Sequence, residues 1–127
     1  MSEANILVVT DDPILRRALR AVLAAKGYQV ATIDSSEDAG VLSKSGKYAL
    51  VLVDDDLYEG TFVEVCRGIR LISEIPIIVM IGDAPDPSAV ESVRDFVNGQ
   101  LRKPFGVSEL FVCLQDSFRK STAVSTI

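Results

Sequence analysis

The chain has 127 residues, the usual length of a single domain, so we expect one folded unit. Apolar residues make up 48% and charged residues 24%, which is typical of a globular protein and excludes a disordered one. The formal net charge is −5, opposite in sign to a nucleic-acid-binding surface, so we expect no direct nucleic-acid contact. The sequence contains no histidine, which excludes His-based general acid–base catalysis and His-activated nucleophiles.

The two cysteines and the hydropathy pattern bear on the compartment. Cys66 and Cys113 are too far apart for a CxxC motif, and we expect buried, inert thiols in a reducing environment. No stretch reaches the roughly 18 apolar residues of a membrane helix, and no signal peptide is evident. We therefore expect a cytoplasmic protein without membrane contact.

Short apolar runs alternate with amphipathic segments along the chain. We expect helix N-caps at Asp12, at Ser35 or Ser36, and at Thr61. In the first half of the chain we predict a strand at 5–10, a helix from Pro13 to a stop at Gly27, a strand at 28–33, a short helix ending near 45–46 and a strand at 49–53. In the second half we predict a helix after Thr61, a strand at 76–81, a loop at 82–87 and a short helix from Ser88. A weak strand at 99–102 and a helix at 107–118 follow.

Five strand–helix units with almost continuously apolar strands predict a parallel sheet covered by helices on both faces. The fold class is therefore α/β, a three-layer α/β/α sandwich. We place this domain at residues 1–120 and treat 121–127 as a short C-terminal tail with no attached output module. In such sheets the functional crevice lies outside the carboxyl ends of the strands.

Acidic residues and one lysine follow three of the predicted strands. Asp11 and Asp12 follow the first strand, 54–56 is a run of three aspartates after the third, and Lys103 follows the fifth. Two ionised carboxylates in a cleft suit a hard divalent cation, and Mg²⁺ is the natural candidate. A lysine beside them suits an incoming phosphoryl group, which a carboxylate can accept as the nucleophile.

Simpler interpretations of these residues remain open. The aspartate run could be a solvated turn, and we expect Asp55 and Asp56 to be solvated charges. Lys103 could be a structural ion-pair partner of Asp54 or Asp11. An aspartate-nucleophile hydrolase is a remote alternative, because the chain has no cap domain to hold a small substrate.

Four segments in a fixed order carry a resemblance to a known family. From Asn5 to about Lys120 the chain resembles the receiver domain of two-component response regulators, a CheY-like fold. The resemblance implies a five-stranded sheet in the order 2-1-3-4-5. The segments are Ile-Leu-Val-Val-Thr-Asp-Asp-Pro at 6–13, Ala-Leu-Val-Leu-Val-Asp at 49–54, Pro-Ile-Ile-Val-Met at 76–80 and Lys-Pro-Phe at 103–105.

The resemblance also implies roles for individual residues. Asp54 matches the phosphoacceptor, Lys103 matches the lysine that pairs with the phosphoryl group, and the peptide before Pro104 would be cis. Asp11, Asp54 and the backbone carbonyl of Asp56 match the Mg²⁺ ligands. The implied activity is at most Mg²⁺-dependent self-phosphorylation from a donor and autodephosphorylation.

The implied partners are proteins. A sensor histidine kinase or a phosphotransfer protein would supply the histidine that this chain lacks, and a downstream protein would receive the signal. We expect a monomer or a weak homodimer.

Four positions depart from the family pattern. Thr10 replaces the first acid of the usual pair, which weakens metal binding, and Ile81 replaces the switch Ser or Thr. Gln100 stands in place of an aromatic residue, and Tyr58 in place of a proline. Two functions therefore remain open: a receiver phosphorylated on Asp54, and a degenerate pseudo-receiver that acts as an interaction module without phosphorylation.

Overall fold

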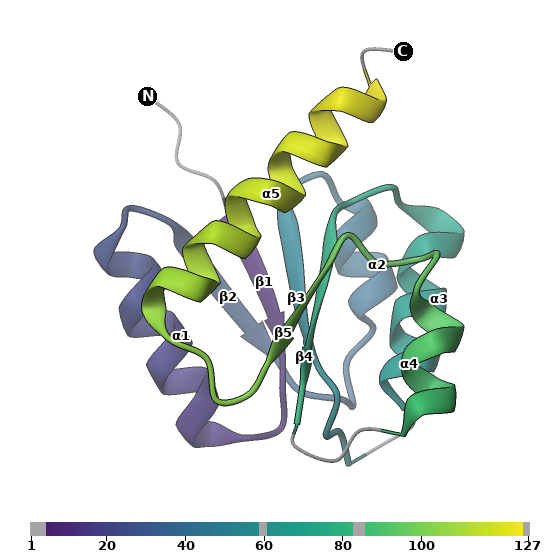
Figure 1. Ribbon diagram of the computed structural model, residues 1–127, viewed down its shortest axis with the longest axis horizontal. Coiled ribbons are helices and arrows are strands. Elements are labelled where there is room, and N and C mark those ends of the chain that lie inside the picture. Colours follow the sequence, from purple (N-terminus) through teal and green to yellow (C-terminus); the bar gives the residue numbers. More distant parts are fainter. Residues whose placement is uncertain (1–4, 59–60, 83–85, 126–127) are drawn as a thin grey trace.

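The five predicted apolar runs form the five strands of one parallel sheet in the order β2-β1-β3-β4-β5 (Figure 1). The computed structural model describes residues 5–58, 61–82 and 86–125. The strands are β1 (Asn5–Val9), β2 (Gln29–Ile33), β3 (Leu50–Asp54), β4 (Ile77–Ile81) and β5 (Gly99–Arg102). The helices are α1 (Pro13–Ala25), α2 (Ala39–Lys44), α3 (Phe62–Ile72), α4 (Pro87–Val93) and α5 (Val107–Ser125). The predicted fold class and strand order are confirmed.

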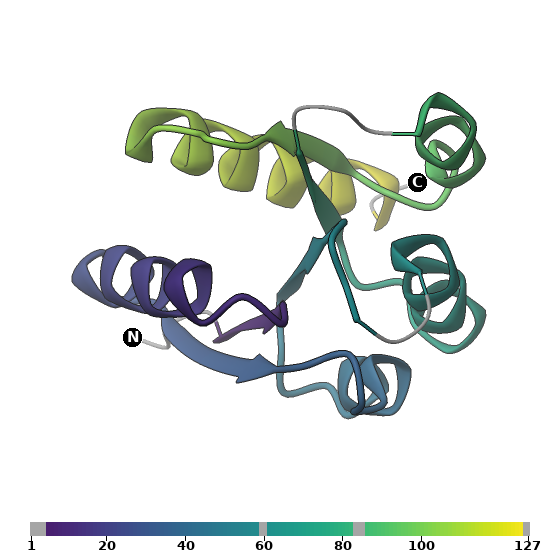
Figure 2. The same cartoon turned by 90° about the horizontal axis from the view of Figure 1, so that it is seen from below.

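The helices cover both faces of the sheet and create two hydrophobic cores. Helices α1 and α5 lie on one face, and α2, α3 and α4 lie on the other (Figure 2). Side chains alternate between the two faces along each strand, so consecutive residues of β1, β3 and β4 are buried in different cores. In the part of the chain that the structure describes, none of the helices combines the length and the hydrophobicity of a membrane-spanning segment.

Two of the predicted helix starts are confirmed. The Asp12 carboxylate caps α1 by accepting the backbone N–H of Ile14 at 2.9 Å. Thr61 and Glu64 form a reciprocal capping box at the start of α3. These caps fix where α1 and α3 begin, directly after the loops at the carboxyl ends of β1 and β3.

Three other helix boundaries differ from the prediction. Asp38, not Ser35 or Ser36, caps α2 by accepting the N–H of Val41. Asp86 caps α4, which starts at Pro87, because proline fits the first turn of a helix. Helix α5 ends at Ser125 instead of Phe118, so it continues past residue 120. The domain boundary at residue 120 stays a prediction.

The two thiols differ in their burial. Cys66 on α3 is fully buried, and this burial raises the pKa of its thiol to about 12. Cys113 on α5 is only half-buried, so the prediction of a buried thiol is correct for Cys66 alone. Neither cysteine is in a disulfide.

Gly99, at the start of β5, is packed against α5 without room for a side chain. A Cβ atom at this position would lie 2.9 Å from Cys113 Sγ and 3.0 Å from Ser117 Oγ. We expect Gly99→Ala to lower the free energy of unfolding by about 1–3 kcal/mol, because the helix must shift to relieve the overlap. Urea unfolding would measure this, and Gly68→Ala, where a Cβ meets nothing within 4 Å, is the matched control.

Candidate functional site

Three predicted site residues extend the rows of strand side chains that face α1 and α5. Val8, Leu52 and Leu101 belong to the core on that face, and each lies two positions before one of the three site residues, Thr10, Asp54 and Lys103. Since the carboxyl ends of parallel strands meet at one edge of the sheet, the three side chains meet there too. The rows are Ile6 and Val8 on β1 followed by Thr10 just after it, Leu50, Leu52 and Asp54 on β3, and Leu101 on β5 followed by Lys103 just after it.

Asp54 lies at the centre of this group and is 1% exposed. Its Oδ2 accepts the hydroxyl proton of Thr10 at 2.7 Å, and its Oδ1 forms an ion pair with Lys103 Nζ. The backbone N–H of Asp56 points to the same Oδ1 at 3.4 Å. Burial alone would lower the pKa of Lys103, but the carboxylates of Asp54 and Asp55 raise it above its ordinary value. The structure therefore holds a buried carboxylate next to a permanent cation.

Thr10 is fully buried and held from two further directions. Its hydroxyl oxygen accepts the N–H of Asp12 at 3.1 Å, and its carbonyl accepts a guanidinium hydrogen from Arg16 at 2.9 Å. The single hydroxyl proton is donated to Asp54, because a carboxylate can only accept hydrogen bonds. Thr10 thus acts as a donor where an acid would add negative charge.

Asp11 connects two loops at the edge of the site. Its Oδ1 accepts the N–H of Ser35 at 3.0 Å, and its Oδ2 accepts the N–H of Tyr58 at 2.7 Å. Burial would raise the pKa of Asp11, but these N–H groups lower it below its usual value. Its carboxylate is therefore ionised and anchors the loops after β2 and β3, a contact that the sequence pattern did not predict.

Asp55 is the site residue that sequence reasoning missed. Its Oδ1 lies 3.0 Å from Lys103 Nζ, and its Oδ2 accepts the N–H of Gly82 at 2.9 Å. The expectation of a solvated Asp55 is wrong, because the residue is half-buried between the ends of β4 and β5, whereas Asp56 is exposed as expected. Three consecutive aspartates give no pattern that singles out the middle one, so the signal was absent from the sequence.

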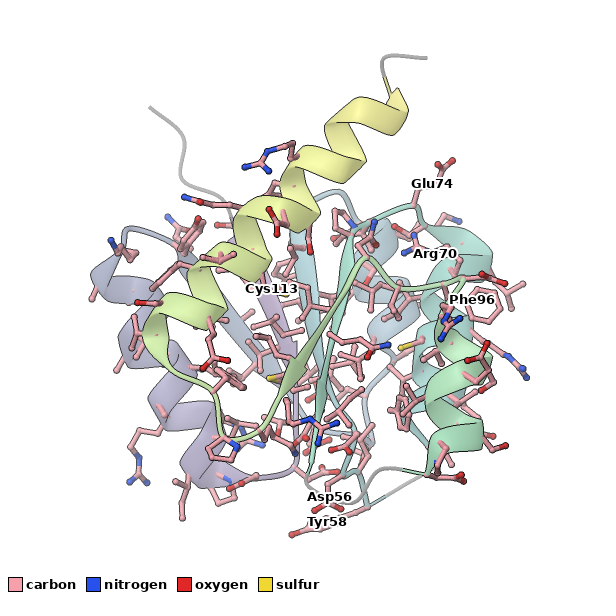
Figure 3. All side chains as sticks on the ribbon, viewed as in Figure 1. Asp56, Tyr58, Arg70, Glu74, Phe96 and Cys113 are labelled. Carbon is pink, nitrogen blue, oxygen red and sulfur yellow. The ribbon has the colours of Figure 1, made fainter. Side chains whose placement is uncertain are left out.

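The two switch positions lie outside this cluster. The Ile81 side chain is 5% exposed and packs in the core beneath α3 and α4, while its carbonyl accepts the Lys103 N–H at 2.7 Å. Gln100 is exposed on β5, and both residues line a depression of about 260 Å³ beside α4. Tyr58 is 81% exposed and lies near Asp56 at one end of the molecule, opposite Glu74 (Figure 3).

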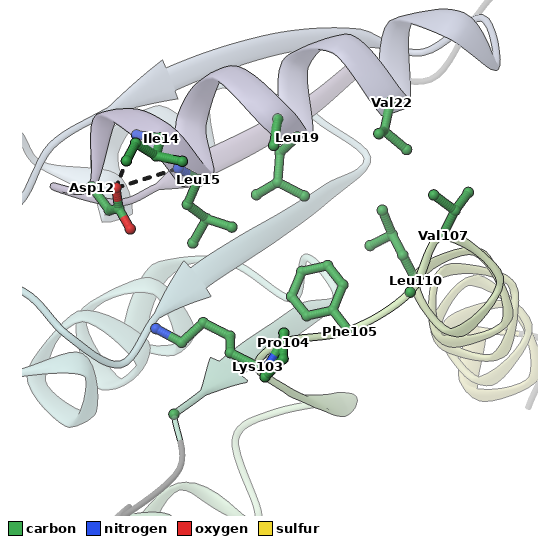
Figure 4. A pocket seen from close by; sticks show the side chains of 13 residues that line it. Asp12, Ile14, Leu15, Leu19, Val22, Lys103, Pro104, Phe105, Val107 and Leu110 are labelled. Carbon is green, nitrogen blue, oxygen red and sulfur yellow. Dashed lines mark hydrogen bonds between the residues drawn. The ribbon is translucent and has the colours of Figure 1, made fainter.

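An apolar groove opens beside Lys103 on the α1/α5 face (Figure 4). It has a volume of about 440 Å³, and Ile14 and Val107 on its walls are 75% and 53% exposed. The Lys103–Pro104 peptide on its floor is cis, as the resemblance implied. Its other walls are formed by Asp12, Leu15, Ala18, Leu19, Val22, Gly82, Phe105, Gly106 and Leu110.

The Mg²⁺ ion implied by the resemblance can be tested against these donors. Among residues 5–58, 61–82 and 86–125, no three His, Cys, Asp or Glu side chains gather as a metal-binding group. Mg²⁺ usually keeps several waters and needs only one or two carboxylates. The carboxylates of Asp11 and Asp54 supply this hard oxygen chemistry, and each oxygen has more than one lone pair. By donor chemistry the Asp11 and Asp54 carboxylates suit Mg²⁺, and both Asp11 oxygens also accept backbone N–H groups.

The chain is similar in sequence to known transcriptional regulatory proteins. The chain is 27% identical over 121 residues to the KDP operon transcriptional regulatory protein KdpE of Escherichia coli, covering 95% of this chain and 54% of that protein. It is 30% identical over 124 residues to the transcriptional regulatory protein KdpE of Mycobacterium tuberculosis, covering 96% and 54%. The chain thus spans about half the length of the curated relatives it matches.

A solved structure and a family model complete the comparison. The crystal structure of a response regulator receiver domain protein from Clostridium thermocellum superposes with a TM-score of 0.85 at 19% identity, covering 95% of this chain and 98% of that one. This likeness shows the shared fold. The model of the response regulator receiver domain matches residues 6–115. By this match and by its fold, the chain belongs to the response regulator receiver domain family.

Proposed function

We propose that this receiver domain accepts one phosphoryl group on Asp54 from a phosphohistidine of a partner protein. Receiver domains of this family are signalling modules and generally not enzymes. The observation that carries the proposal is the buried Asp54 carboxylate held between the Thr10 hydroxyl and the Lys103 ammonium. An oxygen of Asp54 would form a bond to phosphorus while the P–N bond of the donor breaks. The donor nitrogen keeps the electron pair of that bond, and the imidazole takes up one proton from water.

The surrounding residues have separate tasks in this transfer. Lys103 offsets the negative charge that accumulates on the phosphoryl oxygens, and the Thr10 hydroxyl orients one oxygen of Asp54. Asp11, Asp54 and the backbone carbonyl of Asp56 are the residues that would hold Mg²⁺. A bound Mg²⁺ ion would supply further charge neutralisation during the transfer.

The partner would dock next to Asp54. We propose the apolar groove beside Lys103 as this docking place, because Ile14 and Val107 expose apolar surface within reach of the site. A sensor histidine kinase or a phosphotransfer protein is the partner class that would supply the histidine. The KdpE relatives are named transcriptional regulatory proteins, so the expected absence of nucleic-acid contact stays a prediction. The downstream protein partner and the cytoplasmic location also stay predictions.

The test of this proposal is direct phosphorylation in vitro. Incubation with Mg²⁺ and acetyl phosphate should add one phosphoryl group, seen by intact mass and removed by hydroxylamine as an acyl phosphate. Asp54→Asn should abolish the addition, while Asp95→Asn, at an exposed aspartate between α4 and β5, should not. An unmodified native chain, or a label that persists in Asp54→Asn, contradicts the proposal.

A second candidate is an interaction module that acts without phosphorylation. It is favoured by the buried Ile81, which has no hydroxyl, and by Gln100, whose exposed side chain lies away from Asp54. Under this alternative, phosphorylation would leave the amide NMR spectra of β5 and α5 unchanged. Shifts there, or a changed affinity for a protein partner, would exclude it.

A further inference from the structure

A negative charge already occupies the space next to Asp54. The Asp55 carboxylate lies 3.0 Å from Lys103 Nζ and accepts the Gly82 N–H at 2.9 Å. Its position is fixed by the backbone, because the Asp55 N–H donates to the carbonyl of Met80 at 2.9 Å and extends the pairing of β3 with β4. The carboxylate therefore bridges the ends of β4 and β5.

A phosphoryl group on Asp54 would need the same surroundings. Its terminal oxygens carry negative charge and require hydrogen-bond donors or cations in a site that water reaches poorly. The Lys103 ammonium contacts Asp54 and also pairs with Asp55. The Gly82 N–H donates to Asp55. At the end of β4, Ile81 offers no hydroxyl in addition.

We propose that Asp55 is an intramolecular competitor of the phosphoryl group. Its carboxylate shares Lys103 and occupies the Gly82 N–H, so both must be released before a tetrahedral oxyanion can bind beside residue 54. The negative charge of Asp55 would also repel an anion that contacts the same ammonium. For the phosphorylation reaction itself, this inference rests on the proposed role of Asp54 as the acceptor.

The first experiment measures anion binding without any covalent step. In an Asp54→Asn background, inorganic phosphate is titrated and followed by the amide NMR signal of Gly82. We expect D54N/D55N and D54N/D55A to bind phosphate at least about tenfold more tightly than D54N, because a hydrogen-bonded charge has been removed. Equal affinity in D54N and both double variants overturns the proposal.

Matched variants separate the local effect from net charge and folding. D54N/D95N makes the same change in total charge at an exposed aspartate and should bind phosphate like D54N. Asp55→Asn keeps an acceptor for the Gly82 N–H and removes only the charge, so it remains informative where Asp55→Ala does not fold. Circular dichroism identifies the folded variants.

The second experiment measures the rate of phosphorylation with Asp54 intact. With acetyl phosphate and Mg²⁺, we expect Asp55→Asn to be modified at least about tenfold faster than the native chain. Equal rates overturn the competitor role while leaving the proposed function standing. If no chain is modified, the proposed function fails, and the phosphate titration still decides whether Asp55 occupies an anion site.

Discussion

Lys103→Met should lower the free energy of unfolding by about 3–5 kcal/mol, because the buried Asp54 carboxylate loses its counter-charge. Asp54 is 1% exposed, and the Lys103 ammonium forms ion pairs with both Asp54 and Asp55. Methionine keeps most of the aliphatic length, so the loss reports on the charge more than on packing. Urea unfolding of the two proteins measures the difference.

A double-mutant cycle isolates the pair. Asp54→Asn removes the charge that Lys103 neutralises, so D54N/K103M should be less destabilised than the sum of the single variants. Additive effects, or a K103M protein as stable as the native chain, would contradict the assigned ion pair.

The pH dependence of this difference has a defined sign. The folded-state pKa of Lys103 is raised above its ordinary value of 10.5. The pair's contribution is therefore complete below that value and is lost only as the pH rises through the folded pKa. We expect the K103M difference to be the same at about pH 6 and about pH 8.

Much of the fold could be predicted because the strands are chemically uniform. Runs such as 49–53 and 76–81 are apolar at every position and short, which is typical of a strand buried on both faces. The gathering of Asp54 and Lys103 follows from the same pattern, since parallel strands end at one edge and side chains alternate with a period of two. Thr10 joins them for the same reason.

What could not be predicted depends on contacts between loops. The sequence places Asp11 next to Thr10, but nothing in it shows that the Asp11 carboxylate accepts N–H groups from Ser35 and Tyr58. Asp38 instead of a nearby serine caps α2, because several capping residues stand within one turn and only the packed helix decides among them.

Two of the four departures from the family pattern, Thr10 and Ile81, can be considered together with Asp55. Ile81 provides no hydroxyl at the end of β4, and the Asp55 carboxylate accepts the N–H of the following residue, Gly82. Thr10 stands where the family pattern has an acid, so it places a hydrogen-bond donor and no negative charge next to Asp54. With the proposed role of Asp54 as the acceptor, phosphorylation would compete with the contacts that Lys103 and Thr10 already make to this carboxylate and with the Asp55 carboxylate beside it.

Thr10→Asp should reverse part of this arrangement. The new carboxylate would face the buried Asp54 in place of a hydrogen-bond donor, so without metal we expect the free energy of unfolding to fall by about 2–4 kcal/mol. Adding Mg²⁺ should recover most of this loss, because a third carboxylate completes a hard oxygen site. We expect the Mg²⁺ affinity to rise at least about tenfold over the native chain.

Thr10→Val is the matched control because it keeps the shape of the side chain and removes only the hydroxyl. It should cost about 1.5–3 kcal/mol, the range for a hydrogen bond to a charged group, and Mg²⁺ should not restore the loss. Urea unfolding with and without Mg²⁺ and calorimetric Mg²⁺ titration measure both variants. If T10D binds Mg²⁺ no more tightly than T10V, then the carboxylates of residues 10, 11 and 54 do not share a metal, and the Mg²⁺ ligands proposed for this domain are wrong.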